Sequence, residues 1–344
     1  MNIGEKELES LCIGSEITGS GGGGSTYPVK MVLKYYLENG KNPTFMKLKD
    51  VPDSSLVLAV AYIGSPMIMD ERLPQGNNLL SSIKTLENSI GQKTSAIIPL
   101  ESGGVNSLIP LIAGINSSTP VIDADGMGRA FPEISMTTFS FNGVSVAPLT
   151  VSDDYGNVVV AEELNENLSD ELARGIGLIF GGGAWLTAYP MTGGEVKKFA
   201  IEGTVSRNIE IGDVFSLPIQ AEDKIKKLRS RFRARLIGEG YVREIFRYRE
   251  GKFAKGDLYI EFEDGRFIKI SFQNEYMLIR ENKKVIASVP EIISLLDTHT
   301  LQPIDTENVS ADDEVTVLTI PPPSELMTPK ALKKIGPQAF GYEI

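Results

Sequence analysis

The sequence predicts two domains: an α/β domain with a mainly parallel sheet over residues 1–160, and a mainly antiparallel β domain with connecting helices over residues 161–344. Three observations predict this division. The length of 344 residues fits two domains of roughly 150 residues each. Apolar runs alternate with helical segments in the first half, whereas short strands of alternating polarity follow one another in the second. The hydrophobic content of 42% and the charged content of 23% are typical of globular proteins that bury a core.

In the first domain, three apolar runs have the length of buried strands, at 56–63, 95–100 and 120–123. An apolar helix is expected over 105–115, between the second and third runs. A strand, a helix and a second strand in this order form a βαβ unit, whose strands pair in parallel. Farther on, alternating and β-branched residues flank the turn DYGN, 154–157, so a hairpin is expected to close this domain near residue 160.

A glycine-rich segment, ITGSGGGGSTYP at 17–28, lies between a helix expected over 4–13 and a second helix that begins near Pro28. Its glycines can adopt positive φ and bring N–H groups toward a ligand. The segment matches G-x-G-x-x-G, but it lacks the firm preceding strand and the correctly spaced acidic residue of a dinucleotide fingerprint. A structural turn, a nucleotide site and a cradle for an oxyanion or carboxylate therefore stay open. The candidate ligand-binding residues of this segment are Gly21, Gly22, Gly23, Gly24 and Ser25.

Polar loops follow two strands of the predicted βαβ unit. Glu101 and Asn106 come after the second strand, and Asp123, Asp125 and Arg129 come after the third. Ligands bind at the carboxyl ends of the strands in open α/β sheets. Because Asp123 and Asp125 are two residues apart in an extended segment, we expect them to face the same side and one of them to gain a raised pKa. We therefore predict Asp125, Asp123 and Glu101 as catalytic residues and Asn106 and Arg129 as substrate-binding residues. A turn at Asp125, with Asp123 capping the next segment, is the structural alternative.

The second domain is expected to begin with a helix over 162–175 and a glycine-bounded strand over 181–195. A helix over 223–236 has one apolar stripe, and its many basic residues are interpreted as a solvent-exposed face, with an anion-binding patch as the alternative. Short alternating strands over 241–286 and a further strand over 315–323 predict the antiparallel sheet.

Three consecutive polar residues, Gln273, Asn274 and Glu275, interrupt one of the alternating strands. An exposed strand edge would explain this interruption. If the two domains instead close over one cleft, Asn274 and Glu275 are the residues of the second domain that we expect to reach into it, as substrate-binding residues.

Charge and the rare residue types exclude several classes of function. The 34 Lys and Arg residues against 45 Asp and Glu give a net charge of −11, which repels nucleic acid and anionic membranes, so neither is expected as a partner. The N-terminus has acidic residues where a signal peptide needs a basic end, and no apolar run could span a bilayer, so a cytoplasmic location is expected.

The single cysteine, Cys12, cannot form an internal disulfide, and the single histidine, His299, cannot supply a multi-histidine metal site. No nucleotide or metal signature is recognisable, and a divalent metal held by acidic oxygens stays open as a cofactor.

Several motifs together resemble one known family. They are GSGGGG, IGSP at 63–66 with Glu71, ESGGVN at 101–106 and DADGMGRAFPE at 123–133, with further similarity in PMTG, GTVSRNIEIG, FQNE and GPQAFGY. Over nearly its whole length the chain is similar to the S-methyl thiohydantoin desulfurase-like family. The resemblance implies an N-terminal α/β domain followed by a largely β domain, and it adds Glu71 to the substrate-binding candidates.

The activity that the resemblance implies is hydrolysis at C2 of a hydantoin-like ring, with loss of methanethiol from an S-methyl thiohydantoin, or hydrolysis of a related cyclic amide. Such a reaction needs a base for water, donors for developing charge and a clamp for the acidic part of the substrate. The carboxylates, the N–H groups of the glycine-rich segment and Arg129 could supply them. The expected partner is a small cyclic amide, and a homo-oligomer stays open. Two other functions also stay open: a non-catalytic or regulatory protein that binds a small cyclic ligand, and a nucleotide-dependent enzyme that uses the glycine-rich segment.

Overall fold

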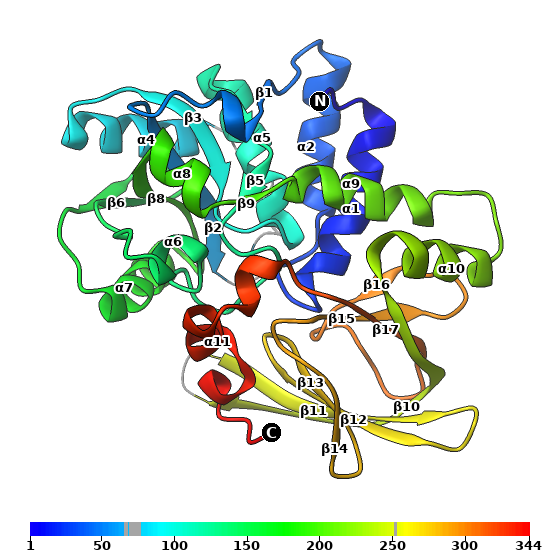
Figure 1. Cartoon of the computed structure of the whole chain (residues 1–344). Helices are drawn as coiled ribbons and strands as arrows, with labels where there is room; N and C mark the ends of the chain where they lie inside the picture. The colour runs from blue at the N-terminus through cyan, green and yellow to red at the C-terminus, as the bar shows by residue number, and fades with distance from the viewer. Residues whose placement is uncertain (65–67, 69–76, 251–252) are drawn as a thin grey trace.

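The computed structural model describes residues 1–64, 68, 77–250 and 253–344. Two large sheets occupy different parts of the molecule: one lies among helices in the upper part of Figure 1, and the other forms the lower part. A two-stranded pairing of β5 (Ala124–Asp125) with β9 (Ile201–Glu202) is separate from both.

The first sheet is mixed and mostly parallel. β1, β4, β3 and β2 pair in parallel, and β8, β6 and β7 are added antiparallel. Within the described residues, five of its seven strands, β1, β4, β3, β2 and β6, therefore run in the same direction. In spatial order the strands are β1 (Phe45–Met46), β4 (Val121–Ile122), β3 (Thr94–Pro99), β2 (Leu56–Gly64), β8 (Gly183–Thr192), β6 (Leu149–Ser152) and β7 (Val158–Ala161).

Helices cover both faces of this sheet, as the continuous apolar sequence of β2 predicts. Val57 and Ala59 of β2 belong to the core on one face, and Leu58 and Val60 belong to the core on the other. The first core includes residues of α6 (Thr138–Phe141), α7 (Glu166–Ile179) and α8 (Gly193–Phe199). The second includes residues of α1 (Glu5–Gly19), α2 (Tyr27–Glu38), α4 (Asn77–Ile90), α5 (Ile109–Ser117) and α9 (Thr204–Phe215).

The second sheet is antiparallel at each of its strand pairs. In spatial order its strands are β14 (Lys284–Ser288), β13 (Glu275–Glu281), β12 (Phe267–Gln273), β11 (Phe253–Phe262), β10 (Arg235–Glu250), β17 (Glu314–Ile320), β15 (Ile292–Asp297) and β16 (Pro303–Ile304). One face packs on α1, α9 and α10 (Ala221–Phe232) through a shared apolar cluster. Through Ile17, this cluster connects the antiparallel sheet to α1, the helix that leads into the glycine-rich segment.

α1 and α9 approach each other closely because glycines lie at their contact. A Cβ on Gly14 would lie 1.8 Å from the Asn208 carbonyl oxygen, and one on Gly212 would lie 1.8 Å from that of Ser10. The glycine-rich segment begins where α1 ends, so this contact fixes its starting point against the rest of the fold.

The C-terminal segment returns to the first domain. Its helix α11 (Pro329–Ile335) lies beside the α/β part in Figure 1. Leu326, Ile335 and Phe340 are buried in the same core as β2 and α7. The proline-rich end of the chain is therefore part of the packing between the two domains.

The predicted fold class is confirmed: an α/β domain with a mixed, mostly parallel sheet is followed by an antiparallel β domain. The predicted strands at 56–63 and 95–100 correspond to β2 and β3, and the predicted hairpin corresponds to β6 and β7. β8 lies beyond residue 160, where the sequence placed the domain boundary, yet it pairs with β2 at the centre of the first sheet. The first sheet thus takes a strand from the chain that follows that boundary.

Candidate functional site

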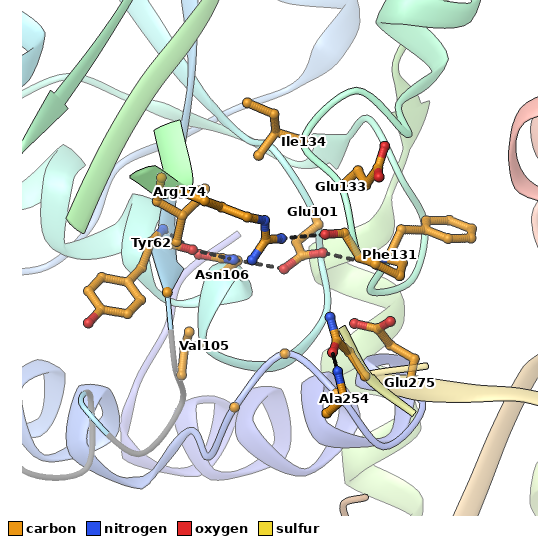
Figure 2. A pocket seen from close by; sticks show the side chains of 18 of the residues that line it. Tyr62, Glu101, Val105, Asn106, Phe131, Glu133, Ile134, Arg174, Ala254 and Glu275 are labelled. Atoms are coloured by element: carbon orange, nitrogen blue, oxygen red, sulfur yellow. Dashed lines mark hydrogen bonds between the residues drawn. The ribbon is translucent and has the colours of Figure 1, made fainter. Parts of the chain in front are cut away.

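A pocket of about 670 Å³ lies where the two domains meet (Figure 2). The first domain supplies the glycines at 21–24, the end of β2 and the loops that follow β3 and β5, and α7, which packs on the first sheet from beyond the predicted boundary, supplies Arg174, Gly177 and Leu178. The second domain supplies residues of β10 and β11, the turn at 274–275 and the segment 305–307. Its size is in the range of roughly 300–1,000 Å³ that is usual for small-molecule sites.

Glu101 follows β3 and is only 7% exposed, although it lines this pocket. Asn106 Nδ2 donates to its Oε1 at 2.7 Å, and the Phe131 N–H donates to its Oε2 at 3.4 Å. Asn106 is itself held by Tyr62, whose N–H donates to Asn106 Oδ1 at 2.6 Å and whose carbonyl accepts from Nδ2 at 3.1 Å. Burial raises the pKa of Glu101 to about 7. A carboxyl group that is held in place and titrates near neutral pH is suited to accept a proton from water.

Glu275 is the first residue of β13 and brings a second carboxyl group to the pocket. It is 4% exposed, and its Oε2 has no hydrogen-bond partner among the residues that the structure describes. Burial raises the pKa of Glu275 to about 8; Arg129 acts to lower it and Glu101 to raise it. The prediction that Glu275 reaches a cleft between the domains agrees with this position.

Asn274, its neighbour, also lines the pocket and occupies the turn between β12 and β13 with a φ of 59°. The Ala254 N–H donates to Asn274 Oδ1 at 3.1 Å, and Thr306 Oγ1 donates to the Asn274 carbonyl at 2.6 Å. These bonds hold the turn that aims Glu275 at the pocket.

Arg174 of α7 is a pocket residue that the sequence analysis missed. Its Nε donates to Asp170 Oδ2 at 3.0 Å, and its Nη2 donates to the Pro132 carbonyl. Figure 2 shows its guanidinium on the same side of the pocket as Glu101 and Asn106. Its positive charge lowers the pKa of both Glu101 and Glu275. The available sequence signal was the Asp170–Arg174 spacing of one helical turn, which is more common on exposed helix faces.

The glycine-rich segment joins two helices, α1 and α2, and is not preceded by a strand. Gly21, Gly22, Gly23 and Gly24 line the pocket as predicted, but Ser25 is not among the lining residues. At the start of α2, the Thr26 donors are already hydrogen-bonded within the protein. Thr26 N and Oγ1 donate to Glu16 Oε1 at 3.1 and 2.7 Å. Because an internal carboxylate occupies this helix start, the geometry gives no support to a phosphate cradle there.

Asp125 lies beneath the pocket wall and differs from its predicted placement. It is fully buried and is not a lining residue. The Ser102 and Gly128 N–H groups donate to its Oδ2 at 2.6 and 2.8 Å. Burial is the largest cause that raises the pKa of Asp125 to about 7, and a charge on Asp123 is not among its principal causes. The carboxyl group fixes the loop that carries Glu101 and has no direct access to a ligand in the pocket.

Asp123 also departs from the predicted pairing with Asp125. Its Oδ1 accepts from the Ser206 N–H at 2.9 Å, and its Oδ2 accepts from the Ser206 hydroxyl. It therefore binds the first turn of α9, a helix far along the chain, and not the segment directly after it that the structural alternative expected. Asp123 lines a different pocket, of about 510 Å³, together with Asp50, Lys47 and Ser206.

Arg129 is not exposed and does not line the pocket, so the predicted contact with a substrate carboxylate is not observed. Its three donor nitrogens bind backbone carbonyls: Nε to Ala130 at 3.0 Å, Nη1 to Glu291 at 2.7 Å and Nη2 to Tyr276 at 3.3 Å. Two of these carbonyls belong to the second domain. Arg129 thus connects the domains, and its charge lies close enough to Glu275 to lower the pKa of that residue.

Two further predictions concern Glu71 and His299. Glu71 lies outside the described residues. His299 is largely exposed and pairs with Glu314 at 3.1 Å on the surface.

Within 1–64, 68, 77–250 and 253–344, no three His, Cys, Asp or Glu side chains gather as metal ligands. In the same part of the chain, no helix has the length and apolar character needed to cross a membrane.

Two family models together span the chain. The model of the S-Me-THD-like N-terminal domain matches residues 6–163, and that of the S-Me-THD-like C-terminal domain matches residues 164–344. The chain belongs to the S-Me-THD-like family. The resemblance to this family that the sequence motifs indicated is therefore confirmed.

The S-Me-THD-like chain is also similar to a solved structure. It is the crystal structure of a protein from Chromobacterium violaceum, determined by the Northeast Structural Genomics Consortium. The two chains share 20% sequence identity, with a TM-score of 0.83, over 99% of this chain and 98% of the other. At this identity the likeness shows a common fold. A search of curated proteins found no match.

Proposed function

We propose that this S-Me-THD-like chain is a hydrolase that acts on a hydantoin-like ring, with an S-methyl thiohydantoin as the substrate and Glu101 as the base. The observation that carries the proposal is the Glu101 carboxyl group: it lines the interdomain pocket, Asn106 holds it at 2.7 Å, and burial brings its pKa to about 7. The family to which the chain belongs supports the choice of substrate.

The pocket has the two kinds of surface that such a ring needs. The backbone of the glycines at 21–24 lines part of the pocket, and a flat ring can lie against it. Ile63, Met127, Phe131 and Ile134 offer apolar contacts for a methylthio group. Arg174 is the cation beside Glu101, and a guanidinium at this place can stabilise negative charge that develops on the ring.

The proposed reaction assigns a role to these positions. Glu101 takes one proton from water while the water oxygen forms a bond to C2, and the electron pair of the ring C2–N double bond moves to nitrogen. That nitrogen takes a proton from a donor. The C2–S bond then breaks, the new hydroxyl proton returns to the donor, and methanethiol leaves with the proton that Glu101 held. The products are a hydantoin and methanethiol.

The experiment is an assay of the purified chain with S-methyl thiohydantoins, unsubstituted hydantoin and a six-membered cyclic amide, in which methanethiol is measured with a thiol reagent. We expect one methanethiol for each hydantoin formed. Thermal shift with the same compounds and with ATP and NAD provides the second readout, because a ligand of the folded state raises the midpoint. A midpoint raised by cyclic amides without turnover would favour a binding protein, and one raised only by a nucleotide would favour the nucleotide-dependent alternative.

A further inference from the structure

We propose that Glu275, on the antiparallel β domain, is the proton donor to the ring nitrogen, and that position 22 is glycine because the Glu275 side chain fills the space next to it. The inference rests on the proposed function and extends it: the catalytic pair is divided between the two domains. In this proposal, the glycine-rich segment allows the Glu275 carboxyl group to lie directly against its backbone.

A side chain at position 22 would require the Glu275 side chain to shift. A Cβ on Gly22 would lie 2.6 Å from Glu275 Cγ and 2.7 Å from Glu275 Oε1. Gly21, Gly23 and Gly24 have φ values of 82°, 77° and 75°, which explain glycine at those positions by conformation. Gly22 is not among the residues with positive φ. At this position the reason for glycine is therefore the close approach of Glu275.

The Glu275 carboxyl group is placed to act on a ligand. It lines the pocket, and among the described residues its buried Oε2 has no partner. The charged groups that act on it are Arg129, Arg174 and Glu101. Gly22 and the neighbouring Gln273 and Asn274 carry no charge. With its pKa raised to about 8, Glu275 holds a proton at neutral pH that it can donate.

The start of β13 is held against the glycine-rich segment by backbone hydrogen bonds. The Tyr276 N–H donates to the Ser20 carbonyl at 2.7 Å, and the Thr306 N–H donates to the Gly21 carbonyl at 2.9 Å. The Tyr276 carbonyl accepts from Arg129 Nη2 at 3.3 Å. Glu275 is thus fixed from the first domain as well as from its own sheet, as a proton donor must be to reach the reacting nitrogen.

In the reaction, Glu275 gives its proton to the ring nitrogen as the C2–N double bond opens, and it becomes a carboxylate. It regains a proton from the C2 hydroxyl when the C2–S bond breaks. The rate of such a donor falls as pH rises past its pKa, because the deprotonated form cannot donate.

The test is a double-variant cycle with Gly22→Ala, Glu275→Ala and the combination of the two, in which the unfolding midpoint of each is measured. Gly175→Ala is the matched control, because a Cβ on that glycine meets no atom within 4 Å and Gly175 does not line the pocket. We expect Gly22→Ala to lower the midpoint in the wild-type background and to lower it far less when Glu275 is Ala. Equal losses in both backgrounds would overturn the contact as the reason for glycine.

The same variants and Glu275→Gln are assayed for methanethiol release between pH 6 and 10. We expect Glu275→Gln to lose about 10²-fold or more in kcat/KM and the fall in rate at high pH, Gly22→Ala to lose about tenfold or more, and Gly175→Ala to match the wild type. If Glu101→Gln is inactive while Glu275→Gln keeps the wild-type rate and high-pH fall, the assignment of Glu275 is wrong and the proposed function stands. If the wild type hydrolyses none of the cyclic amides, the proposed function is wrong, and Glu275 loses its role with it.

Discussion

The loops that follow β3 and β4 carry carboxyl groups at similar positions in the chain, but these groups lie in different surroundings. Each places a carboxyl group just after a parallel strand, Glu101 after β3 and the pair Asp123 and Asp125 after β4. Glu101 faces the interdomain pocket, whereas Asp125 is enclosed by backbone N–H groups and Asp123 caps α9 beside another pocket. A carboxyl group at the carboxyl end of a strand is therefore not sufficient evidence of a catalytic role.

What separates the two loops is whether the carboxyl group reaches the interdomain pocket. Glu101 accepts from the Asn106 side chain and, at 3.4 Å, from the Phe131 N–H, and it lies at the surface of the pocket. Asp125 Oδ2 accepts from the Ser102 and Gly128 N–H groups, and Asp125 does not line the pocket. Both carboxyl groups have a pKa raised to about 7 by burial, so a raised pKa does not by itself distinguish a catalytic carboxyl from a structural one.

The largest effect is expected for Glu101→Gln, which keeps the shape of the side chain and removes the base. We expect kcat/KM for methanethiol release to fall by about 10² to 10⁴-fold, with little change in the unfolding midpoint. Asp125→Asn is the matched control from the other loop, and it should stay within about tenfold of the wild type. A comparable loss in both variants would contradict the distinction between the loops.

The next effect is expected for Arg129→Met, on the loop after β5. The substitution removes the guanidinium donors from the carbonyls of Ala130, Tyr276 and Glu291 in a buried place, so the free energy of unfolding should fall by about 3–5 kcal/mol. Arg231→Met, which removes an exposed guanidinium paired with Glu210, should change it by less than about 1 kcal/mol. Denaturant unfolding of both variants measures the difference, and equal losses would mean that Arg129 does not join the domains.

A smaller effect is expected in the pH dependence of stability. Asp125 titrates near 7 in the folded chain against a usual value of 3.8, so the folded state favours its protonated form. The stability that this provides is fully present below about pH 4 and is lost as pH rises through about 7. Glu101 and Glu275 act in the same direction, up to about 8. Asp125→Asn should therefore make the unfolding free energy fall less steeply between pH 5 and 8, and an unchanged slope would contradict the burial of a titrating carboxyl group.

The smallest effect is expected for His299→Ala. His299 lies on the surface with Glu314 and is not among the residues that line the pocket. Its removal should leave kcat/KM within a few fold. An inactive His299→Ala variant that still folds would place the chemistry in the second domain alone.

The sequence predicts the framework of the site better than its exposed surface. Strands β2 and β3 were predictable because a strand covered on both faces must be apolar throughout. Glu101 and Asn106 were predictable because polar residues after such strands meet at one edge. The opposite placements of Asp125 and Arg174 were not predictable, because they depend on how loops and α7 pack on residues far away in the chain. Glu275 was indicated only by the interruption of an alternating strand.

The most direct test of the account is a crystal structure of the chain with a bound hydantoin, the product of the proposed reaction. We expect the ring to lie against the glycines at 21–24, with a polar ring atom within about 3.2 Å of the Glu101 carboxyl group. A ring bound in the other pocket beside Asp123, or in the interdomain pocket without contact to Glu101, would contradict the account.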